Sequence, residues 1–219
     1  MNTQVITLAQ GRRLRRRSAL RRNGGTQPPG VRPQVRTGTP NALIGMLVFL
    51  GAEAMFFAGL ISAFLVLRAG SAAWPPPDQP RLPVVVTFVN TLILLFSGYS
   101  MTRVVDAMRA DRRQQANRLL GITVLLGLAF LLVQGSEWLR LLHYGMLMTS
   151  GVYAAMFYVI IGCHGLHVLA GLVLLVAVLW HALQGRFTAQ AHVPIEASRL
   201  YWLFVVGVWP LLYVLVYLS

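Results

Sequence analysis

The stretch Ser150–Ala182, SGVYAAMFYVIIGCHGLHVLAGLVLLVAVLWHA, decides the fold class of this chain. It contains no Asp, Glu, Lys or Arg, and it is longer than the about 20 apolar residues that a helix needs to cross a bilayer. We therefore expect a transmembrane helix here, long enough to tilt or to project beyond the bilayer. Two histidines, His164 and His167, lie inside the stretch, at a depth where polar groups are costly.

Similar apolar runs recur along the chain. Of its 219 residues, 56% are hydrophobic and 11% are charged, whereas a soluble domain carries about 25% charged residues. The sequence therefore predicts an all-α, polytopic membrane bundle with five transmembrane helices, at about 41–68, 82–105, 118–142, 150–182 and 197–218.

The charge is unevenly distributed. All 19 basic residues are arginine, and residues 1–36 contain nine of them and no acidic residue. We expect residues 1–40 to form an Arg-rich, Gly/Pro-rich, disordered cytoplasmic tail ahead of a transmembrane domain at 41–219. The tail also resembles a mitochondrial transit peptide in composition, and we do not expect it to bind nucleic acid.

The arginines also orient the predicted spans. Arg186 and Arg199 lie in or beside the connection between the fourth and fifth spans, and five arginines crowd the connection between the second and third. These five are Arg103, Arg109, Arg112, Arg113 and Arg118. Because basic residues stay on the cytoplasmic side, we expect the N-terminus inside and the C-terminus outside.

Three ionisable residues are expected at the middle of the membrane. Glu53 lies about halfway along the first span, and His164 and His167 lie near the middle of the fourth. The three could bind a metal or haem, handle protons, or form a hydrogen-bonded network that links helices. We favour the network, because a metal site needs three or four ligands and further histidines are not expected at this depth. We expect no metal, haem or copper in this chain.

Two further polar groups are candidate sites. Near the outer surface we expect a satisfied interfacial cluster, which we prefer to a catalytic site. Its members are Asn90, Gln134, Glu137 and Arg140. At the start of the fifth span, Glu196 and Arg199 are spaced as a helix-start acid and its local partner.

Four stretches of the chain together resemble subunit III of the haem–copper respiratory oxidases, in its shorter five-span bacterial form. The first, AEAMFFAGLISAF, contains Glu53, and the second is WPPPDQPRLPVVVTFVNTLILLFSG. The third combines QGSEWLRL with SGVYAAMFYVIIGCHGLHVLAG, and the fourth is EASRLYWLFVVGVWPLLY. The resemblance covers about residues 41–218.

The resemblance implies a non-catalytic accessory subunit of a proton-pumping terminal oxidase, in the inner (plasma) membrane of a bacterium. Haem and copper would then lie in the partner subunits, the catalytic subunit I and subunit II. The subunit would bind phospholipid in a cleft and support assembly and sustained proton uptake. The residues at family positions would serve the lipid cleft and the helix interfaces: Glu53, Glu137, His164, His167 and Glu196.

The chain departs from the family pattern in its last stretch, where Leu203 and Val206 replace the commonly found His and Asp. This departure keeps open a subunit III-like protein associated with nitric oxide reductase. Two other classes also remain open: a stand-alone proton-coupled carrier that uses Glu53 with His164 and His167, and a haem-binding membrane cytochrome.

Overall fold

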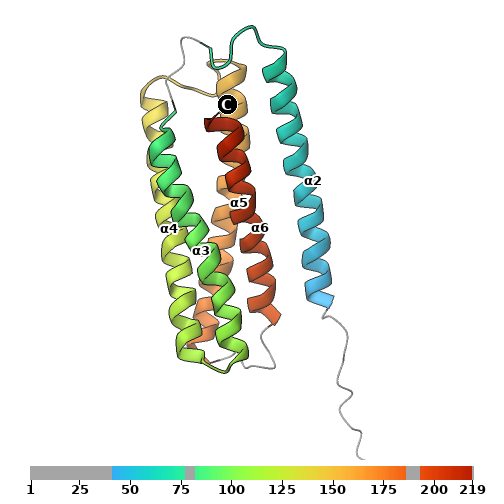
Figure 1. Ribbon diagram of the computed structural model, residues 1–219, viewed down its shortest axis with the longest axis vertical. Coiled ribbons are helices and arrows are strands. Elements are labelled where there is room, and N and C mark those ends of the chain that lie inside the picture. The colour runs from blue at the N-terminus through green and yellow to red at the C-terminus, as the bar shows by residue number, and fades with distance from the viewer. Residues whose placement is uncertain (1–40, 77–81, 186–192, 219) are drawn as a thin grey trace, which may run out of the picture. The chain divides into compact units, whose positions relative to one another are not determined.

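The computed structural model describes residues 41–76, 82–185 and 193–218. The predicted tail, 1–40, and part of the loop before the second span lie outside the described residues, as do Arg81, Arg186 and His192. Within the described part, helices are the only regular secondary structure and there is no strand, and each of five helices is long and apolar enough to cross a membrane (Figure 1). The predicted fold class is therefore confirmed. The helices are α2 (Asn41–Ala69), α3 (Val84–Arg109), α4 (Arg113–His143), α5 (Val152–Leu183) and α6 (Val193–Tyr217).

A tight turn joins α3 to α4. Only Ala110, Asp111 and Arg112 separate them, and the Arg112 amide donates to the Ala107 carbonyl at 2.9 Å. Asp111 has φ of 53°, in the left-handed region that Asp and Asn tolerate at helix ends. A turn this short places two antiparallel helices side by side. It also lets α4 begin among polar residues, ahead of the predicted span at about 118, so this helix extends beyond its apolar part.

Four helices form a closed ring. α3 packs against α4 and α6, and α5 packs against the same two helices. α2 contacts only α5 and α6, and it stands at the edge of the bundle (Figure 1). Only 6% of the residues in the most apolar stretch of α2 are buried, against 50% in α6. Most of the α2 surface is therefore left for lipid or for another protein.

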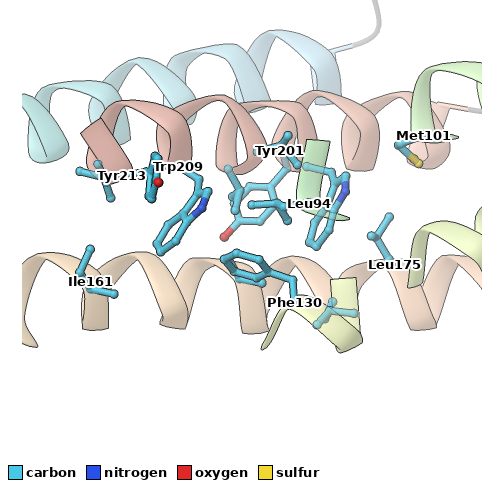
Figure 2. Close-up of a cluster of buried hydrophobic side chains, with 14 of the residues drawn as sticks. Leu94, Met101, Phe130, Ile161, Leu175, Tyr201, Trp209 and Tyr213 are labelled. Carbon is cyan, nitrogen blue, oxygen red and sulfur yellow. The ribbon is translucent and has the colours of Figure 1, made fainter. Parts of the chain in front are cut away.

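Two tryptophans of α6 occupy the centre of the ring. Trp202 and Trp209 are both fully buried. The aromatic rings of Trp209 and Phe130 meet edge to face with centroids 5.0 Å apart, in the cluster that Figure 2 shows. The indole of Trp202 lies against Gly127 of α4 and Gly171 of α5. These glycines allow the close helix contact that packing in lipid favours.

Candidate functional site

Glu53 of α2 and His167 of α5 form a largely buried polar pair. The Glu53 Oε2 atom lies 2.9 Å from His167 Nε2, and both side chains are about four-fifths buried, being 20% and 18% exposed. The other ring nitrogen, Nδ1, lies 2.7 Å from the carbonyl oxygen of Cys163, one helical turn back. The sequence named His164 and His167 as partners for Glu53, and the structure brings Glu53 and His167 together.

The hydrogen bond to Cys163 restricts how this pair can carry its protons. A carbonyl oxygen only accepts hydrogen bonds, so Nδ1 of His167 must carry a hydrogen and donate a hydrogen bond to the Cys163 carbonyl. Nε2 then either accepts a hydrogen bond from a neutral Glu53 carboxyl group or, when it is protonated, donates a hydrogen bond to the Glu53 carboxylate. Both forms have the same number of protons and no net charge. Burial of the pair is therefore much less costly than burial of a single charge.

Aromatic side chains surround the pair. The ring of Phe57 meets His167 edge to face, with centroids 5.1 Å apart, and Phe56 stacks at 6.3 Å. The Tyr201 hydroxyl donates to the His167 carbonyl at 3.1 Å. Beside the pair is an open groove of about 300 Å³, lined by Phe49, Leu166, His167, Ala170 and Tyr201. The pair therefore lies at the edge of the bundle, next to an apolar surface.

His164 does not join this pair. It is 1% exposed and stacks on Trp209 with ring centroids 4.9 Å apart. In the described part of the chain, neither ring nitrogen has a hydrogen-bond partner. Three residues turn an α-helix by about 300°, so two histidines at this spacing point about 60° apart. That angle directs His167 to α2 and His164 into the ring of α3 to α6.

The four residues predicted as an outer polar cluster make separate contacts instead of one network. Each contact is short, and two of the three join different helices. The contacts are Asn90 Nδ2 to the Phe130 carbonyl at 3.1 Å, Gln134 Nε2 to the Tyr217 hydroxyl at 2.9 Å, and Arg140 Nη1 to Glu137 Oε1 at 2.9 Å.

The helix-start acid Glu196 links two helices. Its Oε1 atom forms an ion pair at 2.6 Å with Arg109 Nη2 at the end of α3, whereas the sequence suggested a pair with Arg199 on the same helix. The Nε atom of Arg199 is buried without a hydrogen-bond partner among the described residues. The roles of Arg109, Tyr201 and Tyr217 were not predicted from the sequence. For Arg109 a signal existed, because the predicted topology puts the end of the second span and the start of the fifth on the same side.

The structure offers few candidate metal ligands in one place. Among residues 41–76, 82–185 and 193–218, no three His, Cys, Asp or Glu side chains group closely enough to hold a metal ion. The Glu53–His167 pair supplies two potential ligands, and each already makes a hydrogen bond to the other.

The comparisons with known proteins all identify the same family. Residues 32–219 match the family described as cytochrome c oxidase subunit III. Cytochrome c oxidase subunit 3 of Synechocystis sp. is 39% identical over 177 residues, which cover 80% of this chain and 75% of the relative. The Thermostichus vulcanus protein is 36% identical, covering 80% of this chain and 86% of the relative. The Homo sapiens protein is 37% identical over 179 residues, which cover 79% of this chain and 67% of that protein.

Proposed function

Because this chain belongs to the cytochrome c oxidase subunit III family, we propose that it works as the non-catalytic accessory subunit of a haem–copper terminal oxidase. Membership in this family implies a complex with other oxidase subunits. Its partners in this proposal are the catalytic subunit I and subunit II, which hold the haem and copper. The relatives above are named as cytochrome c oxidase subunits, so the comparisons favour an oxidase over the nitric oxide reductase alternative.

The observation that carries the proposal is the pairing of Glu53 with His167 inside a chain of this family. The imidazole uses both ring nitrogens, one with Oε2 of Glu53 and the other with the Cys163 carbonyl. The pair therefore has a structural use at membrane depth that needs no redox centre. Electron transfer then takes place in a companion chain.

A lipid-binding role follows from the surroundings of the pair. The groove beside His167 is lined by Phe49 of α2, Tyr201 of α6, and Leu166 and Ala170 of α5. An apolar groove at the edge of a bundle suits a phospholipid acyl chain. In this proposal the Glu53–His167 pair holds α2 in the position that keeps the groove open to the lipid.

The proposed location is the plasma membrane of a bacterium, with the N-terminal end of α2 in the cytoplasm. α2 begins at the end of the bundle where α3 turns into α4 (Figure 1). Arg112 lies in that turn and Arg109 and Arg113 flank it, and basic residues next to spans stay inside. This supports a cytoplasmic start for α2.

Co-purification tests the function. An affinity-tagged chain is extracted from its own host membranes in mild detergent, and we expect it to bring down a haem-containing catalytic subunit with oxygen-consuming activity. A stable, solitary chain without an attached oxidase contradicts the proposal. Nitric oxide consumption in place of oxygen consumption supports the reductase alternative, and a Soret band from the isolated chain identifies a cytochrome. Solute-coupled proton flux in vesicles that contain only this chain identifies a carrier.

A further inference from the structure

We propose that the outward face of α3 is a binding surface for one anionic phospholipid, with Arg103 as the ligand of its phosphate group. The surface, called here the α3 stripe, consists of Phe88, Leu92, Phe96, Tyr99 and Arg103. The four apolar or aromatic members are between 40% and 64% exposed, and Arg103 is exposed as well. Their spacing of four, four, three and four residues puts them on one side of the helix.

The part of the α3 stripe from Leu92 to Arg103 has the length of one lipid leaflet. Leu92 and Arg103 are eleven residues apart, which corresponds to about 16 Å along a helix. Half of the hydrocarbon core of a bilayer is about 15 Å thick. An acyl chain along Leu92 and Phe96 therefore brings its headgroup to the level of Tyr99 and Arg103, where an amphipathic tyrosine ring is also expected.

The Arg103 side chain is directed toward the stripe. Its guanidinium carbon lies 6.0 Å from the centre of the Tyr99 ring, one turn back along α3. The ring thus holds the cation toward the membrane and away from the α3–α4 turn. A guanidinium group in this orientation can donate two hydrogen bonds to one phosphate.

The charge of Arg103 is available to an external anion. Among the described residues no carboxylate lies within 4.0 Å of Arg103, although Asp106 is one turn further along α3. Arg112 and Arg118 at the same end of the hairpin also have no ion-pair partner in the described part of the chain. An excess of unpaired arginine favours a lipid with net negative charge over a zwitterionic one.

The α3 stripe is separate from the groove beside His167. α3 packs against α4 and α6, and it makes no contact with α2 in the described structure. The inference therefore depends on the position of α3 in a membrane and not on the Glu53–His167 pair. Its failure leaves the proposed function intact, and failure of the co-purification test leaves this inference intact.

Lipid retention measures the binding. The complex that contains the full chain is reconstituted into nanodiscs of phosphatidylglycerol and phosphatidylcholine, and the lipids that remain bound after extraction are quantified by mass spectrometry. We expect wild type to retain phosphatidylglycerol preferentially and Arg103→Gln to lower that preference about fivefold, the effect of one basic residue at an anionic surface. Tyr99→Leu should lower it less, and Tyr99→Phe should preserve it. Arg68→Gln, at the other end of the bundle, is the matched control and should behave as wild type.

Two outcomes overturn the proposal. One is an unchanged ratio of retained phosphatidylglycerol to phosphatidylcholine in Arg103→Gln. That result would mean that the arginines only set the orientation of the chain in the membrane. The other is displacement of the lipid by glycerol phosphate but not by chloride at equal ionic strength, which identifies a site for free phosphate. If Arg103→Gln does not assemble, the salt dependence of lipid retention by the wild-type complex tests the proposal. Its preference for phosphatidylglycerol should fall as salt is raised, and a salt-independent preference contradicts a charge-based site.

Discussion

Glu53 of α2 and His167 of α5 meet at 2.9 Å, and in the part of the chain that the structure describes no other polar side-chain contact joins α2 to the remaining helices. The rest of the attachment is apolar, and Phe57 and Phe64 are the only two side chains that α2 buries within its described length. Hydrophobicity alone does not hold helices together in lipid, because the lipid is equally apolar. The pair is therefore central to the position of α2.

Replacement of Glu53 by Ala should loosen α2. The change leaves Nε2 of His167 without its partner, and a hydrogen bond between membrane helices contributes about 1 kcal/mol. We expect normal insertion, a lower midpoint in sodium dodecyl sulfate titration followed by circular dichroism, and faster inactivation of the oxidase during turnover. Glu53→Gln keeps a group that can hydrogen-bond Nε2 and should lose less. Wild-type stability and turnover in Glu53→Ala would remove the case for this pair.

The indole of Trp202 should make two glycines intolerant of alanine. A Cβ atom on Gly127 would lie 2.8 Å from Trp202 Cη2, and one on Gly171 would lie 2.9 Å from Cε3 of the same ring. Trp202 is fully buried and cannot easily move aside. We expect each Gly→Ala change to cost about 1–3 kcal/mol of unfolding free energy, as overpacking of a core does.

Matched glycines on the same two helices provide the control for these variants. A Cβ on Gly135 of α4 meets nothing within 4 Å, and one on Gly162 of α5 reaches only Trp138, at 3.6 Å. Gly135→Ala and Gly162→Ala should be neutral or slightly stabilising, because alanine favours a helix over glycine. Equal losses of stability at all four positions in the detergent titration would argue against a clash with the Trp202 indole.

A hydrogen bond between α6 and α3 should also be measurable. The Trp209 Nε1–H group donates to the Thr91 hydroxyl at 2.8 Å, and both residues are buried. Thr91→Val keeps the shape but leaves the indole N–H unpaired, so we expect a loss of about 1–3 kcal/mol. Thr91→Ser keeps the hydroxyl and should lose less. Thr102→Val, on the exposed side of α3, should have little effect, and a cost equal to that of Thr91→Val would contradict this explanation.

The sequence predicted the helices, and it placed Glu53 at the depth of both His164 and His167, because both follow from local patterns and depth. Apolar runs mark the helices, and counting residues from the membrane surface places Glu53 level with His167. His164 packs on Trp209 and does not pair with Glu53, and this depends on how α5 is rotated against α4 and α6. Similarly, the partners of Gln134 and Asn90 are Tyr217 and the Phe130 carbonyl, on other helices. Helix rotation and neighbour order are set by packing across the whole bundle, so spacing in one chain does not reveal them.

The Arg109–Glu196 ion pair gives the last prediction, one of salt dependence. The pair joins the end of α3 to the start of α6 at 2.6 Å, with the Arg109 side chain 55% exposed and that of Glu196 16% exposed. Water and ions reach such a pair, so its contribution should be at most about 1 kcal/mol and should be screened by salt. We expect Glu196→Gln to lower the stability of the chain in low salt and to approach wild type as sodium chloride is raised. Asp111→Asn, which breaks the more exposed pair with Arg113, is the control and should have a smaller effect at every salt concentration. A deficit in Glu196→Gln that is undiminished in high salt would mean that Glu196 stabilises the helix ends through hydrogen bonds and not through its charge.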